Sequence, residues 1–138
     1  MNSNIENFNS PKRVGILANH MIPQAMELGE VLKTNLDSQN FWWIKNINDL
    51  EGISNNLDET DLIITIGGDG TILRAAHISA LKEIPILGIN MGTVGFMCEI
   101  EASDCIEELP NYLDGSSIIE KRMMLKAEII RKGKKVEY

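Results

Sequence analysis

Apolar residues along this chain occur in two kinds of run, and the two kinds alternate. Short runs rich in β-branched and aromatic residues are typical of buried strands. Four such runs predict strands, at residues 12–18, 41–44, 61–66 and 85–89. Most of the segments between them have helical spacing of apolar residues. The chain therefore predicts an α/β fold, with right-handed crossovers and a mostly parallel sheet covered by helices.

The segments between and after the strands are less uniform. Residues 23–36 place apolar side chains on one face, after a proline suited to the first turn of a helix. Residues 71–80 predict a second helix with a face of small side chains. Residues 102–113 predict a third helix, which Pro110 should kink or interrupt. Residues 47–60 are rich in Asn and Asp with weak periodicity, which predicts a loop with room for one helical turn.

The two ends of the chain differ from its middle. Residues 1–11 are polar and Asn-rich, which predicts a loose leader before an α/β domain at residues 12–117. Residues 118–138 contain seven basic residues and alternate in polarity, with Gly133 as a turn. That pattern predicts an antiparallel hairpin. We therefore expect residues 118–138 to be the start of a second, β-rich domain that is truncated in this sequence.

The candidate chemistry lies where the third strand passes into the second helix. Residues 67–71 read Gly-Gly-Asp-Gly-Thr. Glycines let phosphates approach the backbone, and the free N–H groups of a helix start attract them. Asp69 would repel phosphate unless it held a metal, accepted a hydroxyl proton or bonded ribose hydroxyls. The alternative is that Asp69 only caps the helix. Capping requires no flanking glycines, so we favour a functional role.

A second glycine cluster follows the fourth strand. Residues 88–97 read Gly-Ile-Asn-Met-Gly-Thr-Val-Gly-Phe-Met. Ligands of parallel sheets bind at the carboxyl ends of the strands, so both glycine loops should open at one edge of the sheet. The alternative is a tight turn followed by a short strand through Phe96. Arg74, the only Lys or Arg between Lys45 and Lys82, is either the local counter-charge for a phosphate or a solvated helix arginine.

Composition narrows the possible partners. The net charge of −7 argues against nucleic acid, which requires a basic surface. Cys98 and Cys105 match no zinc or redox spacing. No apolar run is long enough for a membrane span, and the first ten residues do not resemble a signal peptide, so we expect no membrane partner and a soluble, cytoplasmic protein.

Several common nucleotide-binding and catalytic patterns are missing from the sequence. The P-loop pattern Gly-x-x-x-x-Gly-Lys-Ser/Thr and the dinucleotide pattern Gly-x-Gly-x-x-Gly are both absent. These absences exclude a P-loop mechanism and a dehydrogenase-like mode of NAD binding. His20 and His77 have no ligand or triad partner, so we expect them to be structural or exposed.

The two glycine motifs together resemble the N-terminal domain of the NAD kinases. The second motif of that family is usually Gly-x-Asn-x-Gly-x-Leu-Gly-Phe-Leu, and here Val94 and Met97 replace the two leucines. The run at residues 120–125 also resembles the beginning of the β domain of that family, so the likeness covers about residues 13–138. The first motif alone is shared with phosphofructokinases and with diacylglycerol or sphingosine-type lipid kinases. The two motifs at this spacing are more specific.

This resemblance implies transfer of a phosphoryl group from ATP, or from polyphosphate in some members, to the adenosine 2′-hydroxyl of NAD. It implies that Asp69 is the catalytic base and contacts the NAD ribose, and that Mg²⁺ accompanies the triphosphate. No metal ligand on the protein is assigned. The resemblance assigns the remaining nucleotide-binding positions to residues of both loops and the helix: Gly67, Gly68, Gly70, Thr71, Arg74, Asn90 and Gly92.

Part of the family pattern lies outside this sequence. In the family, an Asn-Glu or Asn-Asp pair that grips the nicotinamide nucleotide follows this region, together with the β domain and its subunit interface. We therefore expect a homo-oligomer at full length and little activity from residues 1–138 alone. Two alternatives remain: a lipid or sugar kinase that shares the first glycine turn, and a non-enzymatic nucleotide-binding module.

Overall fold

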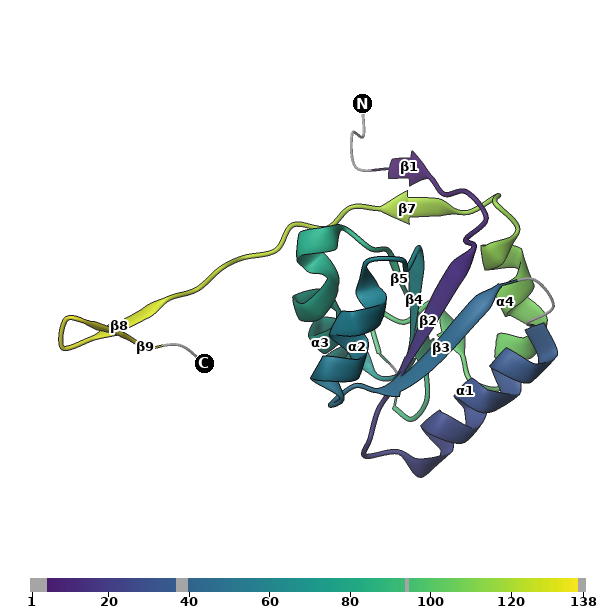
Figure 1. Cartoon of the computed structure of the whole chain (residues 1–138), viewed down its shortest axis with the longest axis horizontal. Coiled ribbons are helices and arrows are strands. Elements are labelled where there is room, and N and C mark those ends of the chain that lie inside the picture. Colours follow the sequence, from purple (N-terminus) through teal and green to yellow (C-terminus); the bar gives the residue numbers. More distant parts are fainter. Residues whose placement is uncertain (1–4, 37–39, 94, 137–138) are drawn as a thin grey trace.

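The computed structural model describes residues 5–36, 40–93 and 95–136. Its centre is a five-stranded parallel sheet with strand order β3-β2-β4-β5-β6 (Figure 1). The strands are β2 (Arg13–Ala18), β3 (Phe41–Asn46), β4 (Leu62–Gly67), β5 (Ile86–Asn90) and β6 (Ile100–Glu101). The four strands predicted from the sequence are confirmed as β2 to β5, and the α/β fold class with them.

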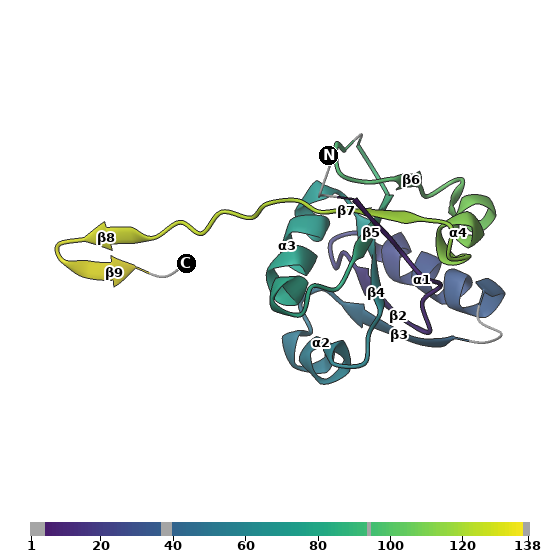
Figure 2. The ribbon, with the colours of Figure 1, turned by 90° about the horizontal axis from the view of Figure 1, so that it is seen from above.

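Helices cover both faces of this sheet, as Figure 2 shows from above. One face packs against α1 (Pro23–Leu36) and α4 (Cys105–Leu113). The other packs against α2 (Leu50–Leu57) and α3 (Asp69–Ser79), and a short 3-10 turn, η1 (Ala80–Lys82), follows α3. The described residues contain no helix that is long and apolar enough to span a membrane.

The direction of the strand order changes between β2 and β4. From β2 the chain crosses through α1 to β3 on one side, and then through α2 to β4 on the other side of β2. The helices that follow β2 and β4, which are α1 and α3, therefore lie on opposite faces of the sheet. The loops at the carboxyl ends of β2 and β4 consequently lead away from each other. A crevice at such a switch point is where parallel sheets bind their ligands.

The expectation of a loop at residues 47–60 is wrong, because residues 50–57 form α2. Asp49 caps this helix by accepting a hydrogen bond from the N–H of Gly52 at 3.0 Å. Ile53 and Leu57, one turn apart, are buried against the sheet. Two buried residues are enough to dock a two-turn helix, and the polar residues between them hid the periodicity.

The interruption expected at Pro110 does not occur, because Pro110 lies inside α4, which runs on to Leu113. The helix nevertheless begins at Cys105 and not at Ala102. Cys105 and Leu109 bury one face of it against the sheet. This packing holds the helix together across the proline, whose missing N–H removes one helical hydrogen bond.

The loose leader expected at residues 1–11 is wrong for residues 5–7, while residues 1–4 lie outside the described part of the chain. Residues 5–7 form β1 (Ile5–Asn7), which pairs antiparallel with β7 (Ile118–Glu120). The N–H of Phe8 extends the pairing by donating to the carbonyl of Ser117 at 2.9 Å. A polar composition does not prevent a strand whose partner comes from more than 100 residues away.

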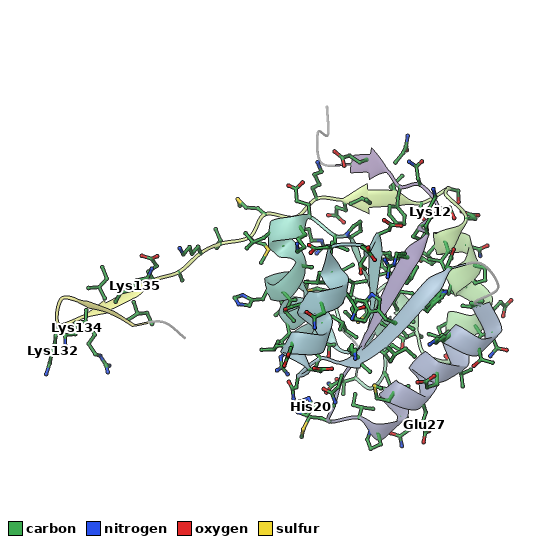
Figure 3. The ribbon with its side chains drawn as sticks, in the orientation of Figure 1. Lys12, His20, Glu27, Lys132, Lys134 and Lys135 are labelled. Carbon is green, nitrogen blue, oxygen red and sulfur yellow. The ribbon has the colours of Figure 1, made fainter. Side chains whose placement is uncertain are left out.

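The antiparallel hairpin expected near the C-terminal end is confirmed. It consists of β8 (Ile129–Arg131) and β9 (Lys134–Val136), joined through Lys132 and Gly133, which both have positive φ. The hairpin stands away from the sheet on an extended segment, with the side chains of Lys132, Lys134 and Lys135 at its far end (Figures 1 and 3). The assignment of residues 118–138 to a second domain stays a prediction.

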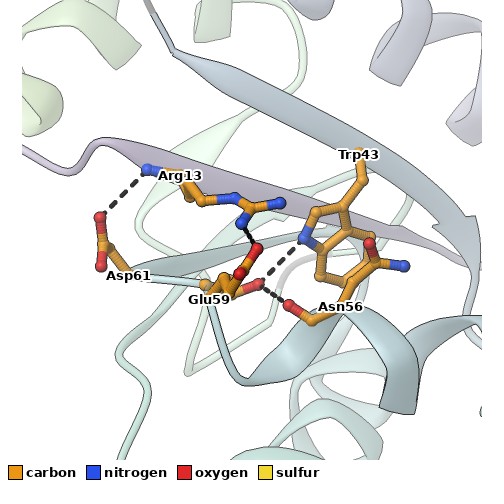
Figure 4. Close-up of polar contacts among 6 residues, drawn as sticks. Arg13, Trp43, Asn56, Glu59 and Asp61 are labelled. Carbon is orange, nitrogen blue, oxygen red and sulfur yellow. Dashed lines mark hydrogen bonds and ion pairs between the residues drawn. The ribbon is translucent and has the colours of Figure 1, made fainter.

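Trp43 fixes the edge strand β3 to the rest of the sheet. Its indole lies over Gly15 of β2, so close that a Cβ on Gly15 would be 2.1 Å from Trp43 Cζ2. The indole Nε1 donates to Thr60 Oγ1 at 3.0 Å, and Thr60 in turn donates to the carbonyl of Asn56 (Figure 4). Arg13, which forms an ion pair with Glu59, lies beside this group (Figure 4).

Gly15→Ala should therefore destabilise the fold, whereas Gly29→Ala in α1 should not. The methyl group added at position 15 would overlap the indole and displace it, at a cost of about 1–3 kcal/mol. A Cβ on Gly29 would meet Ile16 Cγ2 at 3.4 Å, an ordinary contact, and alanine favours the helix by up to about 1 kcal/mol. Urea unfolding followed by tryptophan fluorescence would measure both changes. Equal stability of the two variants would contradict the packing of Trp43 on Gly15.

Candidate functional site

The first glycine loop is a tight junction between β4 and α3. A Cβ on Gly67 would be 2.3 Å from Thr71 Oγ1 and 3.0 Å from Asn19 Cβ, so only glycine fits there. The helix begins at Asp69, two residues before the predicted start, and Gly68 occupies the N-cap position. The alternative that Asp69 merely caps the helix is therefore wrong.

The carboxylate of Asp69 holds the second glycine loop. Its Oδ2 accepts a hydrogen bond from the N–H of Phe96 at 2.9 Å, and its Oδ1 accepts one from the N–H of Met97 at 3.0 Å. Gly95 lies against the same carboxylate, since a Cβ there would be 2.4 Å from Asp69 Oδ1. The expectation that both loops open at one edge of the sheet is confirmed.

The second loop presents an aromatic ring beside this carboxylate. Residues 95–99 form no strand, and β6 begins at Ile100, so the alternative of a strand through Phe96 is wrong. Phe96 is 96% exposed, although its own N–H is bonded to Asp69. The backbone of Phe96 is thus fixed while its ring faces solvent. An exposed phenyl ring is a surface on which a planar ligand can stack.

Asn90 and Gly92 occupy different environments at the start of the second loop. Asn90 is 2% exposed, and its Nδ2 donates to both carboxylate oxygens of Glu101 at 3.2 Å. Its Oδ1 is buried, with no hydrogen-bond partner among the described residues. Gly92 has φ +132 and lies in open space, so this position favours glycine.

A hollow of about 260 Å³ opens at the switch point of the sheet. One wall is the turn after β2, and the other is the start of α3. The hollow is lined by Asn19, His20, Met21, Gly68, Gly70, Thr71 and Arg74. Side chains on Gly68 or Gly70 would meet no atom within 4 Å, so the backbone of α3 is accessible there. His20, predicted to be structural or exposed, is exposed at this edge (Figure 3).

Arg74 is the cationic side chain of this hollow. It is exposed, and its Nη2 donates a hydrogen bond to Oδ1 of Asn48, in the loop between β3 and α2. Sequence reasoning did not single out Asn48. The contact joins residues 26 positions apart, and no local spacing indicates it.

Cys98 directly follows the second glycine loop and lies near three carboxylates. Burial raises the pKa of its thiol, and the negative charges of Asp69, Glu101 and Glu99 raise it further. A thiol with a raised pKa stays protonated at neutral pH, and the thiolate is the reactive form. Among the described residues, no three His, Cys, Asp or Glu side chains are grouped to hold a metal ion.

Comparison with known proteins relates this chain to one family. The family model of the ATP-NAD kinase N-terminal domain matches residues 12–117. The NAD kinase of Dehalococcoides mccartyi (strain CBDB1) is 39% identical over 120 residues, which are 86% of this chain and 42% of that protein. The NAD kinase of Methanothermobacter thermautotrophicus is 38% identical over 122 residues, covering 82% of this chain and 43% of the relative.

The matched region is one part of these relatives. A third, the NAD kinase of Natranaerobius thermophilus, is 45% identical over 87 residues, 62% of this chain and 30% of its own length. The chain thus spans less than half the length of the curated relatives it matches. On the family match and these identities, the chain belongs to the ATP-NAD kinase N-terminal domain family.

Proposed function

We propose that the protein is an NAD kinase, which transfers a phosphoryl group from ATP or polyphosphate to the adenosine 2′-hydroxyl of NAD and so makes NADP. The family membership supports this activity. The observation that carries it is the position of Asp69, whose carboxylate is held by two backbone N–H groups where the two glycine loops meet.

Asp69 is the proposed catalytic base. A carboxylate has about four lone-pair sites, so two hydrogen bonds from the second loop leave others to accept a hydroxyl proton. A ribose hydroxyl is a poor acid, so its proton passes to Asp69 only as the new bond to phosphorus forms. The two N–H bonds keep the carboxylate from rotating away from this proton.

The hollow beside Asp69 is the proposed site of the donor phosphates. Gly68, Gly70 and Thr71 at the start of α3 line it, and the free N–H groups of a helix start attract anions through the helix dipole. In this proposal, Gly67, Gly68, Gly70 and Thr71 form the phosphate-facing turn, with Arg74 as the counter-charge. All of these residues except Gly67 line the hollow. Asn90 and Gly92 would support the second loop on the side of the nicotinamide nucleotide.

Magnesium would reach the site with the donor. Mg²⁺ is usually bound through one or two carboxylates and substrate phosphates, and not by a protein cage. When bound, the ion would neutralise the charge of the transferred phosphoryl group.

The remaining partners follow from the same assignment. We expect a cytoplasmic protein that is a homo-oligomer at full length and binds neither nucleic acid nor a membrane. The net charge of −7 is the reason for expecting no binding of nucleic acid, because phosphate backbones bind basic surfaces.

The purified protein, at its full natural length, should convert NAD to NADP when given ATP and Mg²⁺. An NADP-specific dehydrogenase assay would measure the product. A parallel reaction with diacylglycerol in place of NAD controls for the lipid kinases that share the first glycine turn. Phosphorylation of the lipid alone would reject the assignment.

Asp69→Asn should lower kcat by about 10²–10⁴-fold, the usual contribution of a general base. Asparagine can still accept one of the two N–H bonds, so the fold should remain. Circular dichroism and the unfolding midpoint would serve as controls. A kcat near that of the wild type would remove Asp69 from the mechanism.

Gly95→Ala should test whether the second loop orients this base. The added Cβ would lie 2.4 Å from Asp69 Oδ1, which should displace the carboxylate and break the bonds from Phe96 and Met97. A base displaced by about 1 Å lowers the rate about 10²-fold. Amide hydrogen exchange at residues 96 and 97 should accelerate in Gly95→Ala but not in Gly70→Ala, where the added methyl meets open space. Unchanged exchange in Gly95→Ala would show that this loop does not depend on Asp69.

A further inference from the structure

The guanidinium of Arg74 is held from outside its own helix. Arg74 lies one turn into α3, and its Nη2 donates to Oδ1 of Asn48 in the loop between β3 and α2. An exposed arginine side chain samples many rotamers, and fixing it in one of them costs conformational entropy. A partner that restrains the side chain before a ligand arrives removes part of that cost from binding.

Asn48 is itself fixed by its neighbours. Its N–H donates to Asn46 Oδ1 at 2.9 Å, and its carbonyl accepts from the N–H of Leu50 at 3.0 Å. The preceding residue, Ile47, is buried, and its N–H donates to the carbonyl of Ala18 at the end of β2 at 3.0 Å. The backbone of Asn48 is therefore anchored to the carboxyl ends of β2 and β3, which places its side-chain amide against Arg74.

The restraint leaves the positive charge of Arg74 uncompensated. Asp49 is the next residue, but its carboxylate accepts from the N–H of Gly52 and lies 3.6 Å from Lys45 Nζ. Across the described parts of the chain, Arg74 has no ion pair with a carboxylate. A neutral amide orients the guanidinium and keeps its charge for an anion, whereas a carboxylate in its place would neutralise that charge.

We infer that Asn48 is a positioning residue, which orients Arg74 toward the phosphate chain of the donor. This inference rests on the proposed function, because it assigns the hollow to that phosphate chain. Asn48 acts through Arg74 and does not touch the reacting atoms. Its loss should therefore weaken binding of the donor and leave NAD binding and the chemical step in place.

Asn48→Ala should raise the KM for ATP about five- to tenfold, the effect of losing a hydrogen bond to a charged group. The KM for NAD and kcat should change less than about twofold. Asn55→Ala is the matched control, because Asn55 is an exposed asparagine of α2 whose side chain makes no hydrogen bond within the described residues. In an Arg74→Ala background, Asn48→Ala should have no further effect, because the two residues act as one unit.

Side-chain NMR of Arg74 supplies a readout that does not depend on catalysis. The Nε–Hε order parameter should fall below about 0.6, the range of flexible groups, in Asn48→Ala but not in Asn55→Ala. Asn48→Asp should keep Arg74 ordered and still weaken the binding of inorganic tripolyphosphate. That combination separates orientation of the guanidinium from its charge.

The outcomes separate this inference from the proposed function. A wild-type protein that makes NADP, with the KM for ATP unchanged in Asn48→Ala, would overturn the inference and leave the function standing. A wild-type protein that makes no NADP would reject the function. The inference would then stand only if tripolyphosphate still bound, and bound about five- to tenfold more weakly to Asn48→Ala. An Arg74 side chain equally mobile in the wild type and Asn48→Ala would overturn it in either case.

Discussion

The hydrogen bonds between the Asp69 carboxylate and the backbone of the second glycine loop hold the candidate site together. They join the loop after β4 to the loop after β5, beyond the backbone bond from the N–H of Met91 to the carbonyl of Gly67 where the two loops begin. Each loop contains a glycine whose position leaves no room for a side chain. A Cβ on Gly67 would meet Thr71 and Asn19, and a Cβ on Gly95 would meet the Asp69 carboxylate. The two motifs are thus one structure, and neither would orient the acid alone.

Strand positions and both glycine loops could be predicted because they depend on local sequence. Buried parallel strands require continuous apolar runs, and the turns after them require glycine. The helix at residues 50–57 could not be predicted in this way, since only Ile53 and Leu57 are buried, Leu50 is exposed, and the other residues are glycine or polar. The strand at residues 5–7 depends on a partner at residues 118–120, and no local pattern records such a pairing.

The candidate site also has a part that could be predicted from the sequence and a part that could not. Asp69 and its glycines were identifiable from the chemistry of an acid beside a phosphate-accessible turn. The bonds from Phe96 and Met97 to that acid span 27 and 28 residues and follow from the order of the strands. The contact between Asn48 and Arg74 depends further on the loop after β3, which brings Asn48 within reach of α3 across 26 positions of the chain. Sequence reasoning thus singled out the acid that we propose as the catalytic base but missed the backbone bonds that orient it and the side-chain contact of Arg74.

The net negative charge of this chain makes the orientation of individual donors more important for binding an anionic ligand. A chain with a net charge of −7 repels a triphosphate and a dinucleotide at long range, so it gains little from general electrostatic attraction. Under the proposed function, recognition of the phosphates would then come from a few donors held at fixed positions: the first N–H groups of α3 and the guanidinium of Arg74. Fixed donors are effective because they need no reorganisation as charge develops on the transferred group. If the proposed function holds, the carboxyl edge of this acidic domain would bind anions through the orientation of neutral backbone dipoles and one cation, not through the number of its positive charges.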